Sequence, residues 1–241
     1  MDDTARAWLD KFVDGRHLSD AALATAAARY AGRTPGWVAL DGFLQARLST
    51  VLGRFLARDV EFTTGLGTTT RYGYATAAEF AAASPEQRLF RYGRLEQVGA
   101  RASRTPGLRA YAALSRAFSD DRMRAVFERI CGQPLGRVTL SARRMGASDF
   151  LADHTDDIEG RALSWVIYLT PGWEPRFGGI LELDGPGGRR AEIVPLHGRI
   201  VVFDARAWHR VTPLTEAAGD RARYTFGGWY LKPAPPPGAT W

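Results

Sequence analysis

Two histidines and one aspartate carry the side chains that could hold a metal ion. His154 and Asp156 stand two positions apart, where a strand-like run from Asp149 passes into a loop. Residues two apart in an extended chain point to the same side, so an imidazole and a carboxylate would enter one space. His209 follows a second strand-like run, residues 199–204. Two imidazoles and one carboxylate on one face of iron(II) leave coordination positions open for other ligands.

A basic residue downstream could complete such a site. Arg223 begins the strand-like run of residues 223–231, and Thr225 lies on the same face of that run. A buried guanidinium at this place could hold the far carboxylate of a diacid through paired, charge-assisted hydrogen bonds. The sequence therefore predicts a metal centre with an anion anchor beside it.

Short strands must position these residues. From Gly136 onward, strand-like runs alternate with Gly and Pro turns, at residues 138–142, 163–170, 180–183, 191–194, 199–203 and 223–231. Many short strands with such turns indicate a sandwich or barrel of the jelly-roll type. In the run 163–170, Trp165 and its partners two residues away form an apolar face that suits packing against helices. Tyr168 lies on the opposite face, which could line a pocket.

The first half of the chain has helical periodicity. Apolar residues at helical spacing predict helices over residues 4–13, 20–30, 44–57, 106–118 and 120–131, with a short strand at 37–40. Ser19 should cap the second helix and Gly32 should end it. Residues 61–104 are the least regular segment. They could cover a bound substrate or form a plain surface excursion.

Composition narrows the class of protein. Cys131 is the single cysteine, which excludes an internal disulfide and a Cys-based zinc site. The N-terminus has no apolar run behind it and no stretch is long enough to span a bilayer, so a cytoplasmic enzyme is expected. The net charge of +6 comes from scattered arginines without a basic run, which makes a nucleic-acid partner unexpected.

We expect one domain over residues 1–241, in three parts. Residues 1–135 would be mainly helical and include the possible substrate-covering segment 61–104. Residues 136–232 would form the jelly-roll core. Residues 233–241 would be a loosely held, Pro-rich tail. The sequence does not indicate whether the protein forms oligomers.

The stretch from Val138 to Lys232 resembles the double-stranded β-helix of the iron(II)/2-oxoglutarate-dependent dioxygenase superfamily, in its prolyl-hydroxylase-like branch. The residues that carry the resemblance are His154-Thr155-Asp156, Tyr168-Leu169, Gly172-Trp173, Gly178-Gly179, His209-Arg210-Val211-Thr212-Pro213, and Arg223 with Gly228-Trp229-Tyr230. Asp156-Asp157 followed by Arg161 also resembles a sub-branch that hydroxylates prolyl residues of ribosomal and translation proteins. The resemblance implies an α+β fold with a cupin-like jelly-roll core and N-terminal supporting helices.

Position by position, the resemblance implies roles for five residues. His154, Asp156 and His209 would bind Fe(II). Arg223 would pair with the distal carboxylate of 2-oxoglutarate, and Tyr168 matches a tyrosine that hydrogen-bonds the same carboxylate. With O2 as the second cosubstrate, these residues would form the catalytic site.

The sequence departs from the family at two places. Many relatives carry a tyrosine about nine residues before the first ligand histidine, where this chain has Met145. Thr225 could supply the hydrogen bond that this tyrosine would make. The loop between His209 and Arg223 is also longer than in the shortest relatives, which makes Arg221 a weaker rival for the carboxylate role.

The resemblance implies an oxidoreductase that hydroxylates an unactivated C–H bond while 2-oxoglutarate loses CO2 and becomes succinate. The expected target is an amino-acid or prolyl residue, free, in a peptide or in a protein. One alternative is a tailoring oxygenase that hydroxylates or desaturates a small natural product. Another is a cupin-like metal-binding module or a zinc hydrolase, which would not need Arg223. Arg143, Arg161 and Trp173 are expected near the mouth, where they could contact a carboxylate or a ring.

Overall fold

Antiparallel strands form one continuous sheet in the computed structural model, which describes residues 1–95, 105–158 and 160–234. In chain order the strands are β1 (Trp37–Leu40), β2 (Thr63–Thr68), β3 (Arg88–Arg94), β4 (Val138–Met145), β5 (Phe150–His154), β6 (Arg161–Tyr168), β7 (Leu181–Asp184), β8 (Arg190–Ile193), β9 (Ile200–Asp204), β10 (His209–Val211) and β11 (Arg223–Leu231). The helices are α1 (Asp3–Leu9), α2 (Asp20–Ala31), α3 (Ala46–Arg58), α4 (Ala77–Ala82), α5 (Pro106–Phe118) and α6 (Asp121–Cys131).

The sheet folds over into two layers that enclose a barrel interior. The wide layer has the order β1-β9-β6-β11-β4 and the narrow layer the order β5-β10-β7-β8. Strand β3 joins them, because one of its edges pairs with β4 near Arg94 and with β5 near Phe90, while its other edge pairs with β2. This nearly closed antiparallel barrel with its helices confirms the predicted α+β fold with a jelly-roll core.

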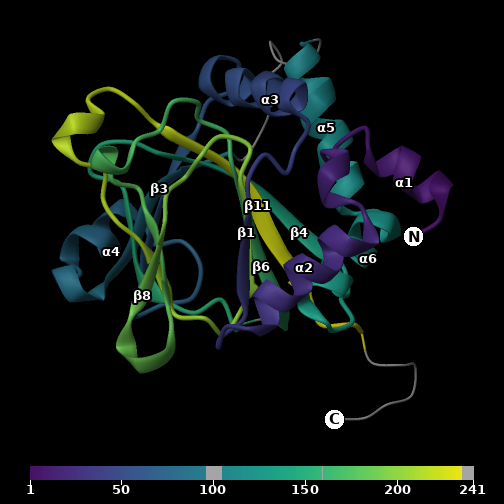
Figure 1. The fold of residues 1–241 in the computed structure, drawn as a ribbon. Helices are drawn as coiled ribbons and strands as arrows, with labels where there is room; N and C mark the ends of the chain where they lie inside the picture. Colours follow the sequence, from purple (N-terminus) through teal and green to yellow (C-terminus); the bar gives the residue numbers. More distant parts are fainter. Residues whose placement is uncertain (96–104, 159, 235–241) are drawn as a thin grey trace.

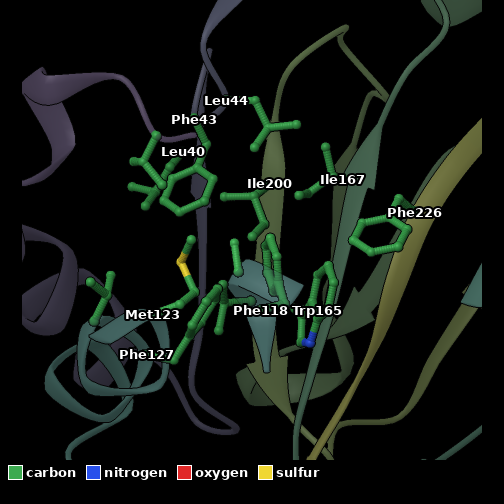
Figure 2. Close-up of a cluster of buried hydrophobic side chains, with 14 of the residues drawn as sticks. Leu40, Phe43, Leu44, Phe118, Met123, Phe127, Trp165, Ile167, Ile200 and Phe226 are labelled. Carbon is green, nitrogen blue, oxygen red and sulfur yellow. The ribbon is translucent and has the colours of Figure 1, made fainter. Parts of the chain in front are cut away.

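Helices cover the outer face of the wide layer. Figure 1 shows α1, α2, α5 and α6 gathered on one side of β1, β6, β11 and β4. Trp165 of β6 stacks on Phe118 of α5 with ring centroids 4.0 Å apart, and Phe226 of β11 meets the same indole edge-on (Figure 2). The apolar face predicted for the run 163–170 therefore packs against the helices. Fully buried aromatic side chains such as Trp165 each contribute about 3–5 kcal/mol to stability, judged by the cost of truncating them.

Local sequence signals place most helix ends. The Ser19 hydroxyl accepts a hydrogen bond from the backbone N–H of Ala22, and Gly32 follows the last turn of α2, both as predicted. The first helix is shorter than the predicted range 4–13 and ends at Leu9. Residues 10–13 do not continue the helix. The Gln45 amide donates hydrogen bonds to the carbonyls of Asp10 and Val13 in this segment.

The segment 61–104 is more regular than the sequence predicts. It supplies β2, α4 and β3, so the mainly helical first part of the chain also adds strands to the barrel. Two glycines in β2 interrupt the alternation of side chains by which a strand is predicted from sequence. A Cβ on Gly67 would lie 2.2 Å from the ring of Phe90 on the paired strand, and one on Gly65 would lie 2.8 Å from Tyr74. Glycine inside a strand often marks such a close approach. Residues 96–104 of this segment lie outside the described residues.

Two further predictions concern the ends and surfaces of the chain. None of the helices in the described ranges is long and apolar enough to cross a membrane. Most of the predicted Pro-rich tail, residues 235–241, lies outside the described residues. Cys131 is a free, half-buried thiol.

Candidate active site

Two neighbouring strands of the narrow layer bring the predicted metal ligands together. His154 ends β5, His209 begins β10, and the two residues face each other in the register of the pair. Their ring centroids are 4.2 Å apart. One ligand atom from each of His154, Asp156 and His209 lies within 4.8 Å of the others. The structure thus gathers the three side chains that the sequence places 55 positions apart at most.

Backbone carbonyls fix the orientation of both imidazoles. The Nδ1 of His154 lies 2.9 Å from the carbonyl oxygen of Ala152, and the Nδ1 of His209 lies 2.9 Å from that of Ala207. A carbonyl can only accept, so each Nδ1 carries the proton and each Nε2 presents a lone pair. The Nε2 atoms lie 3.7 Å and 3.6 Å from the two carboxylate oxygens of Asp156. Such an outer hydrogen bond on each ring is usual for histidines that bind metal ions.

The carboxylate of Asp156 is held from the wide layer. The Ser164 hydroxyl of β6 donates a 2.7 Å hydrogen bond to Oδ2 of Asp156. The backbone N–H of Asp156 donates to the carbonyl of Ala205 at 2.8 Å. Asp156 is therefore oriented by β6 and by the loop after β9, while both histidines belong to the narrow layer.

Protonation in this cluster suits a divalent cation. Burial and the neighbouring His209 lower the pKa of His154 to about 4, which leaves its imidazole neutral near pH 7. Burial alone would raise the pKa of Asp156, but His209, His154 and the hydrogen bond from Ser164 hold it below its usual range. A neutral imidazole and an ionised carboxylate are the forms that bind metals, so this donor set fits iron(II).

Arg223 forms the floor of the site on the wide layer. Its side chain is 5% exposed, and its Cζ lies 4.9 Å from the ring centroid of Tyr168. The Nε of Arg223 and the hydroxyl of Tyr168 are both buried and have no hydrogen-bond partner among the described residues. Burial lowers the pKa of Arg223 and raises the pKa of Tyr168. Unpartnered buried donors are costly, and a carboxylate would satisfy both.

The departure at Met145 is visible next to this arginine. Met145 pairs with Arg223 in the register of β4 and β11, and its Sδ lies 2.9 Å from Nη1 of Arg223. A thioether is a weak acceptor and cannot donate a hydrogen bond to a carboxylate. Thr225 is buried, lines the same cavity and lies opposite Tyr168 in the register of β11 and β6. It is placed to offer a hydroxyl near Arg223, as the sequence suggests.

Two sequence-derived candidates lie elsewhere. Arg221 is exposed, stacks over Phe177 at 4.7 Å and lies outside the cavity lining, so it is not a rival to Arg223. Trp173 does not reach the mouth either. It is buried and donates from its indole nitrogen to the carbonyl of Gly178 at 2.9 Å. A Cβ on Gly179 would touch both the Arg223 stem and Trp173, so this indole packs behind the anchor.

A cavity of about 450 Å³ connects the metal cluster with Arg223. Volumes of this size are typical of sites for small ligands. Arg143, Arg161 and Trp229 line it, as expected for the first two. The hairpin of β2 and β3 and its connection also line the cavity, through Arg71, Tyr72, Tyr74, Phe90 and Tyr92. The aromatic residues between positions 72 and 92 were the available sequence signal for this part of the lining. Their place in the cavity depends on the pairing of β3 with β4 and β5, which are distant in sequence.

Comparisons with known proteins agree with this geometry. A sequence model of the 2OG-Fe(II) oxygenase superfamily matches residues 140–231. Prolyl 3-hydroxylase OGFOD1 of Xenopus laevis is 30% identical over 101 residues, which are 39% of this chain and 19% of that relative. The matched segment thus spans about a fifth of the relative's length.

Solved structures share the fold. A Pseudomonas putida prolyl-4-hydroxylase superposes with a TM-score of 0.60 at 22% identity, covering 88% of this chain and 100% of its own. The non-heme alpha ketoglutarate dependent epimerase SnoN from nogalamycin biosynthesis gives a TM-score of 0.56 at 18% identity, covering 89% and 85% of the two chains. Residues 140–231 are therefore similar to the 2OG-Fe(II) oxygenase superfamily, whose members use Fe(II), 2-oxoglutarate and O2, and the chain shares its fold with the solved prolyl-4-hydroxylase.

Proposed function

We propose that this chain is an Fe(II)- and 2-oxoglutarate-dependent hydroxylase of an amino-acid or prolyl residue, free, in a peptide or in a protein. The observation that supports it best is the pairing of two sites in one cavity. The triad His154, Asp156 and His209 lies at one end, and the unpartnered donors of Arg223 and Tyr168 lie at the other. The curated relative, a prolyl 3-hydroxylase, supports the choice of target.

The residues of the site would have separate roles in this reaction. His154, Asp156 and His209 would hold the iron, with their Nδ1 protons and the Ser164 hydroxyl keeping the three ligands in place. Bound there, the iron with 2-oxoglutarate and O2 would supply the oxidant for a C–H bond, with one oxygen atom going to the hydroxyl group and the other to succinate as CO2 is released. Arg223 would bind the distal carboxylate of the keto acid by charge-assisted hydrogen bonds.

The barrel interior would keep water from the reacting atoms. Phe203 meets the ring of His209 edge-on at 4.8 Å, and Leu181 and Val211 line the cavity from the narrow layer. Apolar walls strengthen the electrostatic contacts at Arg223 because they lower the local dielectric constant. The chain would thus orient the target carbon and exclude competing hydrogen donors.

A tailoring oxygenase of a small natural product is the second candidate. The fold likeness to SnoN and the aromatic side chains of the β2–β3 connection at the mouth support it. Asp156 favours hydroxylation or desaturation over halogenation, since related halogenases have a small residue there. Against a zinc hydrolase or a plain binding module stands Arg223, which such a protein would not need at this depth.

Turnover of 2-oxoglutarate tests the proposal directly. The full chain would be assayed with Fe(II) and O2 for succinate release, alone and with free amino acids, proline-containing peptides and candidate metabolites. We expect stimulation by amino-acid or prolyl compounds. Stimulation by unrelated metabolites alone would favour the tailoring oxygenase, and absence of any 2-oxoglutarate consumption would contradict both.

A further inference from the structure

We propose that Arg143 binds a carboxylate of the substrate, so that the natural substrate is acidic: an amino acid or peptide with a carboxylate near the oxidised carbon. This inference rests on the function proposed above and deepens it. It starts from the four arginines that line the cavity, Arg71, Arg143, Arg161 and Arg223.

The guanidinium of Arg143 lies between two aromatic rings. Its Cζ is 4.9 Å from the ring centroid of Tyr92 on β3 and 5.1 Å from that of Trp229 on β11. Aromatic faces stabilise a cation but do not use its N–H groups. The edge of the planar guanidinium stays available, and a carboxylate fits that edge through two parallel hydrogen bonds.

Arg143 differs from the other arginines of the cavity in its partners. Arg71 donates to both carboxylate oxygens of Glu79 at 2.9 Å, and Arg161 lies 3.6 Å from the Asp156 carboxylate. Arg223 has its own task at the floor. For Arg143, the described part of the chain offers no hydrogen-bond acceptor or carboxylate within bonding distance. Arg143 therefore brings a guanidinium with five N–H donors to the cavity lining, in a half-buried position.

The position of Arg143 assigns its anion to the substrate rather than to 2-oxoglutarate. Arg143 lies two residues along β4 from Met145, so it pairs with Thr225, whereas Met145 pairs with Arg223 on the floor of the site. Its side chain then reaches Trp229, whose ring also carries Arg161 at 3.8 Å. Arg143 and Arg161 thus lie over the same indole ring in the cavity.

A substrate would enter where side chains of the cavity lining are exposed. Tyr72 is 62% exposed and Ile158 is 41% exposed, and both line the cavity. The distal carboxylate of the keto acid belongs at Arg223, on the floor. A second anion at the mouth would therefore come with the substrate.

Charge balance leads to the same substrate class. Arg71 is neutralised by Glu79, and 2-oxoglutarate brings two negative charges against Arg223 and an iron ion already bound by Asp156. In the described part of the chain, Asp156 also lies near Arg161, whereas no carboxylate lies within bonding distance of Arg143. A neutral substrate would leave that cation poorly solvated once the mouth is filled, whereas an acidic one would compensate it.

Matched acid and amide probes test this inference. The full chain with Fe(II), O2 and 2-oxoglutarate would be assayed for succinate release with capped Glu-Pro-Glu and Gln-Pro-Gln peptides and with free glutamate and glutamine. We expect the acidic probe of each pair to be used about tenfold better or more, as the loss of a charge-assisted contact implies. Arg143→Gln should bring the acid-to-amide ratio close to one, and Arg143→Glu should favour a Lys-Pro-Lys peptide.

A ratio measured within one variant cancels changes in the common rate and in folding. Arg221→Gln, an exposed arginine outside the cavity, is the matched control and should keep the wild-type ratio. Absence of acid preference in the wild type would overturn the inference. So would an Arg143→Gln variant that keeps the ratio and instead raises the KM for 2-oxoglutarate, because the anion would then belong to the cosubstrate.

Binding without turnover separates this inference from the proposed function. Calorimetry on the zinc-loaded protein with N-oxalylglycine, an unreactive analogue of 2-oxoglutarate, would compare the same Glu and Gln peptides. Acid-selective binding that depends on Arg143, in a protein that consumes no 2-oxoglutarate, would retain the binding site and reject the hydroxylase. Equal or absent binding of both peptides would overturn the acidic substrate.

Discussion

The two layers of the barrel are built in different ways, although both contribute to one site. The wide layer presents an apolar outer face to the helices, where Trp165 and Phe118 stack. The narrow layer presents a charged outer face, and in Figure 1 its strand β8 lies on the side away from α1, α2, α5 and α6. The wide layer carries Arg223 and Tyr168, whereas the narrow layer carries both histidines. The two halves of the site therefore depend on different forces.

Ion pairs link the strands of the narrow layer across their outer face. Arg190 of β8 contacts Asp153 of β5 at 2.7 Å, Asp184 at 2.8 Å and Glu182 of β7 at 3.4 Å. Arg210 of β10 contacts Glu182 at 2.6 Å and Asp153 at 3.9 Å. We call these five residues the outer ion-pair cluster. Asp153 and Arg210 are the direct neighbours of His154 and His209, so the cluster braces the metal ligands from behind.

The backbone of the narrow layer explains why such a brace is useful. Strands β5 and β10 pair at His209 with His154 and at Val211 with Leu151, and the register shifts between the two positions. An irregular ladder fixes the relative position of the histidines less firmly than the long pairing of β11 with β4 and β6 fixes Arg223. Metal binding should therefore respond to salt, while the binding of 2-oxoglutarate at Arg223 should respond to core packing.

The largest effect should come from removing the residue that both layers share. In Asp156→Ala the carboxylate ligand and the acceptor for Ser164 are lost together. We expect succinate release to fall by about a thousandfold or more, since the metal would keep only two ligands from the narrow layer. Iron or cobalt titration followed by absorption spectroscopy would measure the loss of metal. Normal turnover in this variant would contradict the metal assignment.

Breaking the apolar backing of the wide layer should destabilise the whole fold. Trp165→Ala removes a side chain that stacks on Phe118, and we expect a loss of about 3–5 kcal/mol in the free energy of unfolding. Urea denaturation measures it. Trp208→Ala is the matched control, because Trp208 is 53% exposed and its loss should change stability by less than about 0.5 kcal/mol. Equal effects of the two variants would refute the comparison.

A third variant separates the cosubstrate anchor from the metal centre. Arg223→Ala should raise the KM for 2-oxoglutarate by about tenfold to a hundredfold, the value of a buried charge-assisted contact, while metal binding persists. Arg221→Ala is the control and should behave like the wild type, because its side chain contacts Phe177 and the carbonyl of Ala218 instead of the cavity. Steady-state kinetics at varied 2-oxoglutarate distinguish the two. An unchanged KM in the Arg223 variant would remove this residue from the anchor.

The smallest effect should follow from weakening the outer ion-pair cluster. Glu182→Gln keeps the shape of the residue that accepts from Arg190 and Arg210 but removes its charge. We expect a loss of about 1 kcal/mol in stability and a few-fold weaker metal binding. Metal affinity should also become less sensitive to salt than in the wild type. Glu174→Gln, at an exposed pair with Arg176, should leave metal affinity and its salt dependence unchanged.

Local periodicity predicted the inner face of the barrel well. The two-residue spacing of His154 and Asp156, and the strand phase of Trp165 against Tyr168, depend only on neighbouring residues and are found as expected. Arg221 has the same phase as Arg223, and the two differ only because the strand begins at Arg223 while Arg221 remains in the loop.

The errors concern contacts between distant parts of the chain. Trp173 packs beneath Arg223, where a Cβ on Gly179 would lie 3.1 Å from the arginine stem and 3.3 Å from the indole, and the sequence around Trp173 does not indicate this approach. Strand β3 was missed because the glycines of its partner β2 have a meaning only once Phe90 packs on Gly67. Tyr92 was therefore absent from the sequence-derived site, although it lines the cavity and faces Arg143.

The placement of β3 between the two layers makes the hairpin of β2 and β3 an exchangeable part. It pairs with β4 through Gly93 and Arg94 and with β5 through Phe90 and Arg91, and with few other strand positions. The three metal-binding candidates His154, Asp156 and His209 and the anchor Arg223 all lie outside this hairpin. A hairpin transplanted from a related barrel could thus give the protein a new repertoire of substrates while the oxidising machinery stays the same.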